Sequence, residues 1–347
     1  SSILPCRNCC MARIAFIDVT VTVSYGGVQT ACWRLADALA RAGHEVAMFG
    51  GEGNIRPANL HPNIKVHTFP FRPREKVIDI GSRFQRIVER ASHARHARQV
   101  FAAANYDWAI LTKPFDFYWP WILPRDCKTK FCFMSGGTDF YAGDRALSKK
   151  IDAWVAASQF NAWQIHARYK HWPQVIYNGV ETEKFAPGVR NASLRTRLGI
   201  APDTTLFAFA GRLVGWKGMA VTLKALAEPA LRDTNAKLLI IGDGPQKPEL
   251  QQLTSSLGLT GRVLFHDPVP HDTLPALYGA VDAGVFPSIG DEAFGITIAE
   301  AMSCGKPVIA SHIGGIPEVV GSEESCGLLV PPGDVTALAQ AMRRLAD

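Results

Sequence analysis

Two glutamates, Glu292 and Glu300, stand at the ends of the sequence Glu-Ala-Phe-Gly-Ile-Thr-Ile-Ala-Glu. Glu292 follows an apolar run that predicts a strand, and Glu300 lies roughly one turn into a predicted helix over 296–302. The first N–H groups of that helix, next to Gly295, have no partners within the helix and can bind an anion. A carboxylate, an anion site and a second carboxylate in this order could bind a sugar, its diphosphate and a ribose. The same pattern equally suits an ordinary strand, loop and helix with two solvated glutamates.

A second charged pair, Arg212 and Lys217, lies in a loop flanked by Gly211 and Gly218. The loop follows a predicted strand that begins at residue 206. Two cations fixed at the end of a strand can stabilise the negative charge that develops on a departing pyrophosphate. The alternative is a pair of surface cations without a ligand.

A glycine pair, Gly26 and Gly27, separates a predicted strand over 13–18 from a predicted helix over 30–42. Glycines allow the backbone to approach a ligand closely and to aim N–H groups at negative charge. The third glycine of the G-x-G-x-x-G pattern is missing, so the turn does not predict a dinucleotide site. A tight turn without any ligand would use the same residues.

Strand-like runs alternate with helical patterns along the whole chain, which is typical of parallel α/β proteins. A turn-rich segment interrupts this alternation over 175–188. We therefore expect an N-terminal tail (1–12), a first domain (13–180) and a second domain (181–347). The further predicted strands are 45–49, 108–112, 129–134 and 153–156 in the first domain, and 237–241, 262–265, 283–287 and 307–310 in the second. Ligands of such sheets bind at the carboxyl ends of the strands.

The composition is that of a globular protein, with 47% hydrophobic and 20% charged residues in 347. No apolar run reaches the roughly 18 residues that predict a membrane span, and the first residues lack the apolar core of a signal peptide. We expect a cytoplasmic protein. Cys6, Cys9 and Cys10 have no second pair at a matching spacing and do not predict zinc. The cysteines at 32, 127, 132, 304 and 326 are expected to be reduced, buried and inert.

The charge is unevenly distributed, because residues 1–180 carry 23 Lys and Arg against 13 Asp and Glu, and residues 181–347 carry 14 against 18. Much of the positive excess lies in one arginine-rich segment, 72–98, with apolar residues at nearly helical spacing. A basic amphipathic helix can lie on an anionic membrane or meet an anionic substrate, and a solvated helix face is the alternative. No recognised nucleic-acid motif accompanies the charge.

Eleven short motifs follow one another along the chain, and they are Gly26–Gln29, Ala42–Val46, Asn178–Val180 with Phe185 and Pro187, Gly211–Arg212, Lys217–Gly218, Ile241–Pro245, Glu292–Glu300, Gly305–Val308, Gly314–Gly315, Pro317–Glu318 and Gly327–Pro331. In these motifs and in their order, the sequence from about residue 13 to the end resembles the retaining glycosyltransferases of family 4, which have the GT-B fold. The resemblance implies an α/β protein with two Rossmann-like domains that face each other across a cleft, with the donor on the second domain and the acceptor on the first.

The resemblance also implies roles for individual residues. Arg212 and Lys217 match the pair that holds the diphosphate of the donor, Glu292 the glutamate at the transferred sugar, and Glu300 the carboxylate on the ribose. The implied donor-binding set is Gly26, Gly27, Arg212, Lys217, Val269, Glu292, Phe294, Gly295, Ile296, Thr297 and Glu300, with Val269 at the base and Gln29 and Asp139 on the acceptor side. The three residues implied in catalysis are Arg212, Lys217 and Glu292.

Two departures from the family pattern accompany these matches. Related enzymes often place a histidine where this chain has Ser135-Gly-Gly-Thr-Asp139. Asp139 could bind a hydroxyl there or cap the following helix. Family members also usually end in a helix that crosses back onto the first domain, whereas this chain stops at Asp347. A shortened end would loosen the closure of the two domains.

No Asp-x-Asp motif occurs in the sequence, so we expect a metal-independent reaction without a cofactor, since cations and helix termini can neutralise the diphosphate. The expected activity is the transfer of a hexose from a UDP-, GDP- or ADP-sugar to a glycan or lipid-linked acceptor, as in envelope or exopolysaccharide assembly, with contact to an anionic membrane and no role for nucleic acid. The alternatives are a non-catalytic protein that binds sugar nucleotides or glycans and, behind it, a sugar-nucleotide epimerase.

Overall fold

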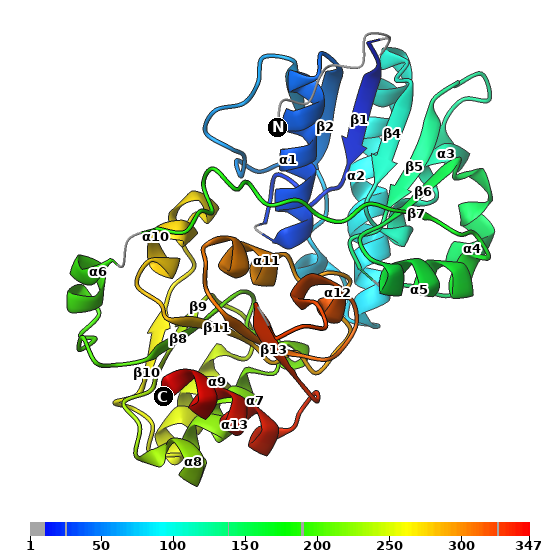
Figure 1. Ribbon diagram of the computed structural model, residues 1–347. Helices are drawn as coiled ribbons and strands as arrows, with labels where there is room; N and C mark the ends of the chain where they lie inside the picture. Colours follow the sequence, from blue (N-terminus) through cyan, green and yellow to red (C-terminus); the bar gives the residue numbers. More distant parts are fainter. Residues whose placement is uncertain (1–10, 25, 138, 189–190, 325) are drawn as a thin grey trace. The chain divides into compact units, whose positions relative to one another are not determined.

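The computed structural model describes residues 11–24, 26–137, 139–188, 191–324 and 326–347. The chain divides between Ile176 and Tyr177 into two compact units, which we call unit 1 and unit 2. Within the described residues, each unit is a parallel β-sheet with helices packed on its faces (Figure 1). The predicted α/β fold class is therefore confirmed.

The sheet of unit 1 has the strand order β3-β2-β1-β4-β5-β6-β7 within the described residues, and its neighbouring strands are parallel. The strands are β1 (Arg13–Ile17), β2 (Glu45–Gly51), β3 (Ile64–Phe69), β4 (Trp108–Leu111), β5 (Lys130–Met134), β6 (Ala153–Ala156) and β7 (Gln174–Val175). The helices are α1 (Gly27–Arg41), α2 (Ser82–Ala104), α3 (Trp119–Ile122), α4 (Asp144–Leu147) and α5 (Gln159–Tyr169), with 3₁₀ turns η1 (Arg74–Lys76), η2 (Pro114–Asp116) and η3 (Ser148–Lys150).

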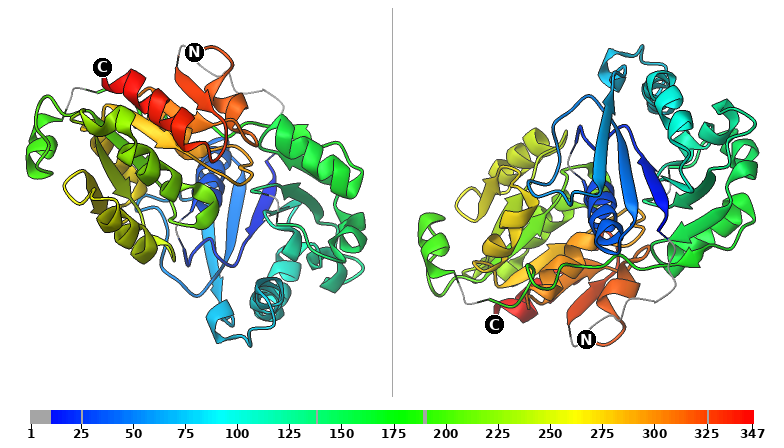
Figure 2. Two further views of the ribbon diagram at one scale, coloured as in Figure 1. Left: turned by 90° about the horizontal axis from the view of Figure 1, so that it is seen from below. Right: turned by 90° about the horizontal axis from the view of Figure 1, so that it is seen from above.

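Helices α1 and α2 cover opposite faces of the unit 1 sheet, because its central strands are apolar on both sides (Figure 2). Alternate residues of β1 point to opposite faces. Ile14 and Phe16 pack with the buried residues of α1, and Ala15 and Ile17 pack with those of α2. The strand order places the carboxyl ends of β1, β4 and β5 next to one another at one edge of the sheet.

The sheet of unit 2 has the order β10-β9-β8-β11-β12-β13 within the described residues, also parallel. The strands are β8 (Leu206–Ala210), β9 (Lys237–Ile241), β10 (Val263–His266), β11 (Ala283–Phe286), β12 (Val308–Ser311) and β13 (Gly327–Val330). The helices are α6 (Ala192–Arg197), α7 (Met219–Ala227), α8 (Pro229–Arg232), α9 (Lys247–Ser256), α10 (Leu274–Tyr278), α11 (Ile296–Ser303), α12 (Ile316–Val320) and α13 (Val335–Ala346), with 3₁₀ turns η4 (Gly215–Lys217) and η5 (His271–Thr273).

Strand β8 lies beside β11 at the centre of this sheet. The loops after these two strands carry Lys217 and Glu292, so the topology brings the two charged motifs of the sequence to one edge. Across the part of the chain that is described, no helix combines the length and the apolar character that crossing a membrane requires.

Candidate functional site

The centre of the candidate site in unit 2 is an ion pair between Lys217 and Glu292. The Lys217 ammonium contacts Oε1 of Glu292, and the same oxygen accepts a hydrogen bond from the Ser288 hydroxyl at 3.1 Å. The ammonium also lies 4.6 Å from the centroid of the Trp216 ring. Both charged side chains are largely buried, with 16% and 12% of their surface exposed. Partial burial strengthens their attraction, because solvent screens it less.

The loop that carries Lys217 is fixed to the end of β11 through its backbone. The Trp216 carbonyl accepts hydrogen bonds from the N–H groups of Ile289 at 2.8 Å and Gly290 at 3.2 Å. Gly218 has a φ of +71°, and a Cβ there would lie 1.9 Å from the Pro287 carbonyl oxygen. Only glycine allows this approach, so Gly218 is the residue that sets Lys217 against Glu292.

Glu292 is held from the other side by the loop after β12. The Gly315 N–H donates to the Glu292 carbonyl at 2.7 Å. Gly314 has a φ of +62°, and a Cβ on it would lie 2.4 Å from the same carbonyl oxygen. The two glycine-dependent contacts, at Gly218 and Gly314, explain why glycines surround the charged motifs in the sequence.

Arg212 lies at the carboxyl end of β8 with its side chain exposed. Its loop packs closely on the loop after β9, because the Leu213 N–H donates to the Asp243 carbonyl at 2.9 Å. A Cβ on Gly242 would lie 1.9 Å from the Gly211 carbonyl oxygen. The backbone at Arg212 is therefore fixed while its guanidinium remains accessible to a ligand.

Helix α11 begins after Gly295, which has a φ of +97°. Phe294 is buried before it, and Ile296 and Thr297 in its first turn are half-buried. The first turn carries no acidic side chain. The N–H groups and the helix dipole thus favour an anion at this end.

Glu300 lies in the second turn of α11 and is 1% exposed. Its Oε1 lies 2.7 Å from Nε2 of His271, whose side chain is one-quarter exposed. The His271 ring also lies 5.0 Å from the Phe185 ring. Sequence reasoning did not include His271, although a histidine close to Val269 was a signal that could have suggested it. Val269 itself is half-buried against the core of unit 2.

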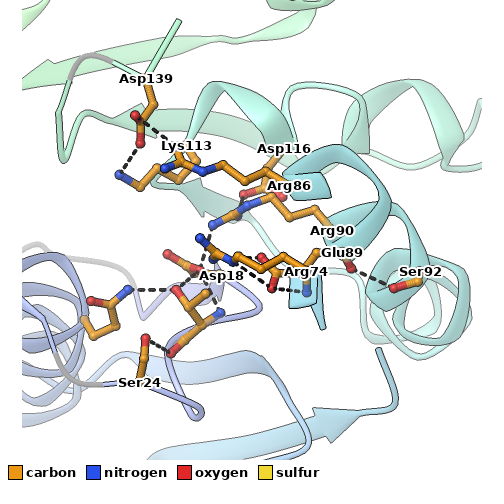
Figure 3. Close-up of polar contacts among 12 residues, drawn as sticks. Asp18, Ser24, Arg74, Arg86, Glu89, Arg90, Ser92, Lys113, Asp116 and Asp139 are labelled. Carbon is orange, nitrogen blue, oxygen red and sulfur yellow. Dashed lines mark hydrogen bonds and ion pairs between the residues drawn. The ribbon is translucent and has the colours of Figure 1, made fainter. Parts of the chain in front are cut away.

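In unit 1, a buried charge network lies below the carboxyl edge of the sheet (Figure 3). Arg90 contacts Asp116 and donates to Asp18 at 3.1 Å. Burial would raise the pKa of Asp18, but Arg90 and the hydroxyls of Thr20 and Thr112 outweigh it and lower that pKa to about 2. Burial dominates at Asp116 and, with the Asp18 charge beside it, raises its pKa to about 7 despite Arg90.

The expectation that the arginine-rich segment is one solvated or membrane-bound face is wrong for part of it. Arg90 is 4% exposed and buried in the network described above. Arg74 binds the buried Glu89 at 3.0 Å, and Arg86 is ion-paired in unit 1. The exposed members are Arg72, Lys76, Arg83, Arg95 and Arg98. The spacing of the arginines predicts one exposed face, but α2 buries Arg90 because two carboxylates from distant parts of the chain, Asp18 and Asp116, pair with it.

The glycine turn of unit 1 is linked to the same network through Gln29. Its side-chain amide donates to the Thr20 hydroxyl at 2.7 Å, and that hydroxyl donates to Asp18 at 2.7 Å. Gly26 precedes α1 and has extended backbone, and Gly27 is the first residue of the helix. A Cβ on Gly26 would lie 2.5 Å from the Gln29 side-chain oxygen.

Asp139 lies at the carboxyl edge of unit 1 and makes two ion pairs. Arg86 approaches it at 2.9 Å and Lys113 at 3.3 Å. Burial alone would raise the pKa of Asp139, but Lys113 and Arg86 outweigh it and lower that pKa. The alternative that Asp139 caps the next helix is wrong, since α4 begins after Gly143 without a side-chain cap.

The cysteines are only partly as expected. Cys32 and Cys304 are buried, Cys127 and Cys132 are half-buried, and Cys326 is exposed. The expectation of burial is wrong for Cys326, which lies just before strand β13 begins. Cys6, Cys9 and Cys10 lie outside the described residues. Within those residues, no group of three or more His, Cys, Asp or Glu side chains is placed to hold a metal ion.

Family models match both units of this chain. A model described as Glycosyltransferase Family 4 matches residues 25–184, and one described as Glycosyl transferases group 1 matches residues 191–347. Two parallel α/β units with charged glycine loops at the strand ends define a protein of the GT-B class. This chain belongs to the family 4 glycosyltransferases.

A relative agrees with that assignment, and solved structures share the fold. A D-inositol 3-phosphate glycosyltransferase of Streptomyces bingchenggensis is 33% identical over 216 residues, which are 59% of this chain and 47% of the relative. The chain thus spans about half the length of this relative. Sucrose-phosphate synthase from Thermosynechococcus elongatus has a TM-score of 0.81 at 24% identity, over 96% of this chain and 89% of that one. Anabaena Alr3699/HepE in complex with UDP-glucose has a TM-score of 0.73 at 23% identity, over 96% and 94%.

Proposed function

We propose that this chain is a retaining glycosyltransferase that moves a hexose from a nucleoside-diphosphate sugar to a hydroxyl group of an acceptor. The observation that carries the proposal is the contact between Lys217 and Glu292 at the adjoining ends of β8 and β11. Lys217, which would bind the diphosphate, thereby lies beside Glu292, which would bind the hydroxyls of the sugar. Arg212 and the first turn of α11 would add positive charge to the same donor site.

In the proposed reaction, the bond between the anomeric carbon and the phosphate oxygen breaks, and its electron pair stays on the nucleoside diphosphate. The acceptor oxygen forms its bond to the anomeric carbon on the same face, and its proton passes to the departing phosphate oxygen. Arg212 and Lys217 stabilise the charge on the leaving group, so no protein nucleophile or metal ion is required. Glu292 holds the hydroxyls of the sugar while this occurs.

The nucleotide end of the donor would lie along α11. Phe294, Gly295, Ile296 and Thr297 would approach the sugar and phosphates through their backbone, Glu300 would bind the ribose, and Val269 would contact the base. Because the Glu300 carboxylate is nearly buried against the His271 ring, the ribose would bind where the carboxylate and this ring meet. UDP, GDP and ADP donors all fit this scheme, and the solved relative with UDP-glucose supports a nucleotide sugar.

The acceptor would bind unit 1, near Gly26, Gly27 and Gln29. The positive excess of residues 1–180 favours an anionic or lipid-linked acceptor, as in the assembly of envelope or exopolysaccharide glycans. Three exposed apolar side chains, Ile78, Ile80 and Phe84, lie close in sequence to exposed Lys76 and Arg83. We propose that this segment makes peripheral contact with the inner face of an anionic membrane.

The test is a panel of UDP-, GDP- and ADP-hexoses incubated with the full chain, with and without candidate hydroxyl acceptors, in buffer containing a metal chelator. Release of nucleotide that depends on acceptor, with the anomeric configuration kept in the product, supports the proposal. Interconversion of sugars without release would identify an epimerase. Tight binding without either reaction would identify a non-catalytic binding protein.

A further inference from the structure

Three charged side chains meet at the carboxyl edge of the unit 1 sheet, outside the buried network (Figure 3). Lys113 follows β4, Asp139 follows β5, and Arg86 reaches them from α2. Their side chains are 18%, 40% and 32% exposed, respectively. A small solute can therefore reach all three, which is not true of Arg90 below them.

The Arg86 guanidinium and the backbone of Lys113 are held in place independently of the carboxylate. Lys113 lies between β4 and η2, directly before the buried Pro114 and Phe115. The Arg86 guanidinium lies 5.8 Å from the centroid of the Phe115 ring, within range of a cation–π contact. The Phe115 ring is in turn stacked on Tyr141 at 4.8 Å.

Asp139 is the more movable partner, because it belongs to a loop rather than to a helix or a strand end. Gly137 precedes it by two positions and has a φ of +151°, with no atom within 4 Å of a Cβ placed on it, whereas Gly136 packs against Val28. Glycine backbone in open space can change conformation at little cost. The carboxylate could thus leave its two cations without disturbing the core.

We propose that Arg86 and Lys113 form a phosphate subsite for the acceptor, and that Asp139 is an internal counter-ion that a phosphate monoester displaces. This inference rests on the proposed function, in which unit 1 binds the acceptor. A tethered carboxylate competes at a high effective concentration, which disfavours exchange for another monoanion. A phosphate monoester carries nearly two charges and three acceptor oxygens, which match a planar guanidinium and an ammonium.

The decisive variant is Asp139→Asn, because it separates a counter-ion from a ligand. Removing a competing carboxylate should strengthen the binding of inorganic phosphate and of glucose 6-phosphate to the full chain by about tenfold, measured by titration calorimetry. A side chain that bound an acceptor hydroxyl would, when changed to Asn, weaken binding or leave it unaltered. Either of those results would overturn the proposal.

Arg86→Gln and Lys113→Gln should each weaken phosphate binding by about tenfold. Lys128→Gln is the matched control, because Lys128 is exposed and precedes β5, at the opposite edge of the sheet from Asp139. It should leave binding unchanged, and equal loss in all three variants would refute a local site. Circular dichroism confirms that each variant is folded.

The experiments distinguish a failure of the subsite proposal from a failure of the proposed function. If D139N tightens phosphate binding but no sugar donor is consumed, the subsite stands and the transferase proposal falls. If a donor is consumed while phosphate affinity is the same in D139N and in the parent chain, the transferase proposal stands and the subsite falls.

Discussion

The Lys217 ammonium rests against the Glu292 carboxylate in unit 2, with Ser288 on the same oxygen. Neither residue is near the other in sequence, and the pairing of β8 with β11 brings them together. A donor diphosphate would compete with Glu292 for this ammonium. Lys217 should therefore affect the leaving group, and Glu292 the sugar.

Lys217→Met should lower kcat for sugar transfer by about 100-fold or more, the cost of removing one fixed charge from a developing anion. Glu292→Gln should reduce turnover with the sugar donor yet keep the affinity for the free nucleoside diphosphate. Lys224→Met, on the exposed side of α7, is the control and should leave kcat unchanged. Equal effects of K217M and K224M on initial rates would rule out this role.

Gly218 and Gly258 provide a matched pair for the loop that carries Lys217. Their φ angles are +71° and +69°, but only Gly218 would place a Cβ against backbone, 1.9 Å from the Pro287 carbonyl oxygen. Gly258→Ala should cost about 1–2 kcal/mol from backbone strain alone. Gly218→Ala should cost more and also raise KM for the donor, because the loop must shift. Urea midpoints and donor titrations of both variants check this, and identical behaviour would show that the contact is unimportant.

The stability of unit 1 should respond to pH through two buried groups that act in opposite directions. Burial lowers the pKa of His93 to about 4, so between pH 4 and 6.5 the unfolded state binds the extra proton and stability rises with pH. Asp116, with its pKa raised to about 7, is protonated in the folded state from about pH 4 to 7, so its contribution falls as pH rises.

Relative to the parent chain, His93→Gln should therefore lose stability as pH rises from 4.5 to 6.5, and Asp116→Asn should gain stability over the same range. The Gln amide can still donate to the Gly50 carbonyl that His93 contacts at 3.0 Å. Urea unfolding at the two pH values measures both variants. The same pH dependence in both variants would contradict the assignment.

The segment with exposed Ile80 and Arg83 should bind vesicles that contain an anionic lipid. The double variant I80D/R83E should weaken the partitioning about tenfold or more, because it removes an apolar contact and reverses a charge. Lys128→Glu makes the same charge reversal as R83E at another place on unit 1 and serves as the control. Sedimentation with phosphatidylglycerol vesicles at two salt concentrations measures this partitioning. Equal vesicle binding by the parent chain and the double variant would show that this segment does not contact the membrane.

Much of the fold follows from local pattern in the sequence. The apolar runs at β1, β8 and β11 predict buried parallel strands, and their predicted bounds differ by only a few residues from those observed. The edge strands β3 and β7 were not predicted. Strand β7 has two residues, and β3 carries Lys65 and His67 between its apolar positions. Short or polar strands lack the continuous hydrophobic signal that burial on both faces requires.

The charged motifs can be recognised in the sequence alone, since the spacing of glycines, cations and carboxylates is a local property. The partners of these charged residues depend on the fold. The fold pairs Lys217 with Glu292 and His271 with Glu300 in unit 2. In unit 1 it pairs the buried Arg90 with Asp18 and Asp116, and it pairs Asp139 with Arg86 and Lys113. These pairs depend on strand order, which joins loops far apart in the chain. Whether a charge is solvated or paired is fixed by that order and by burial, and neither can be read from spacing.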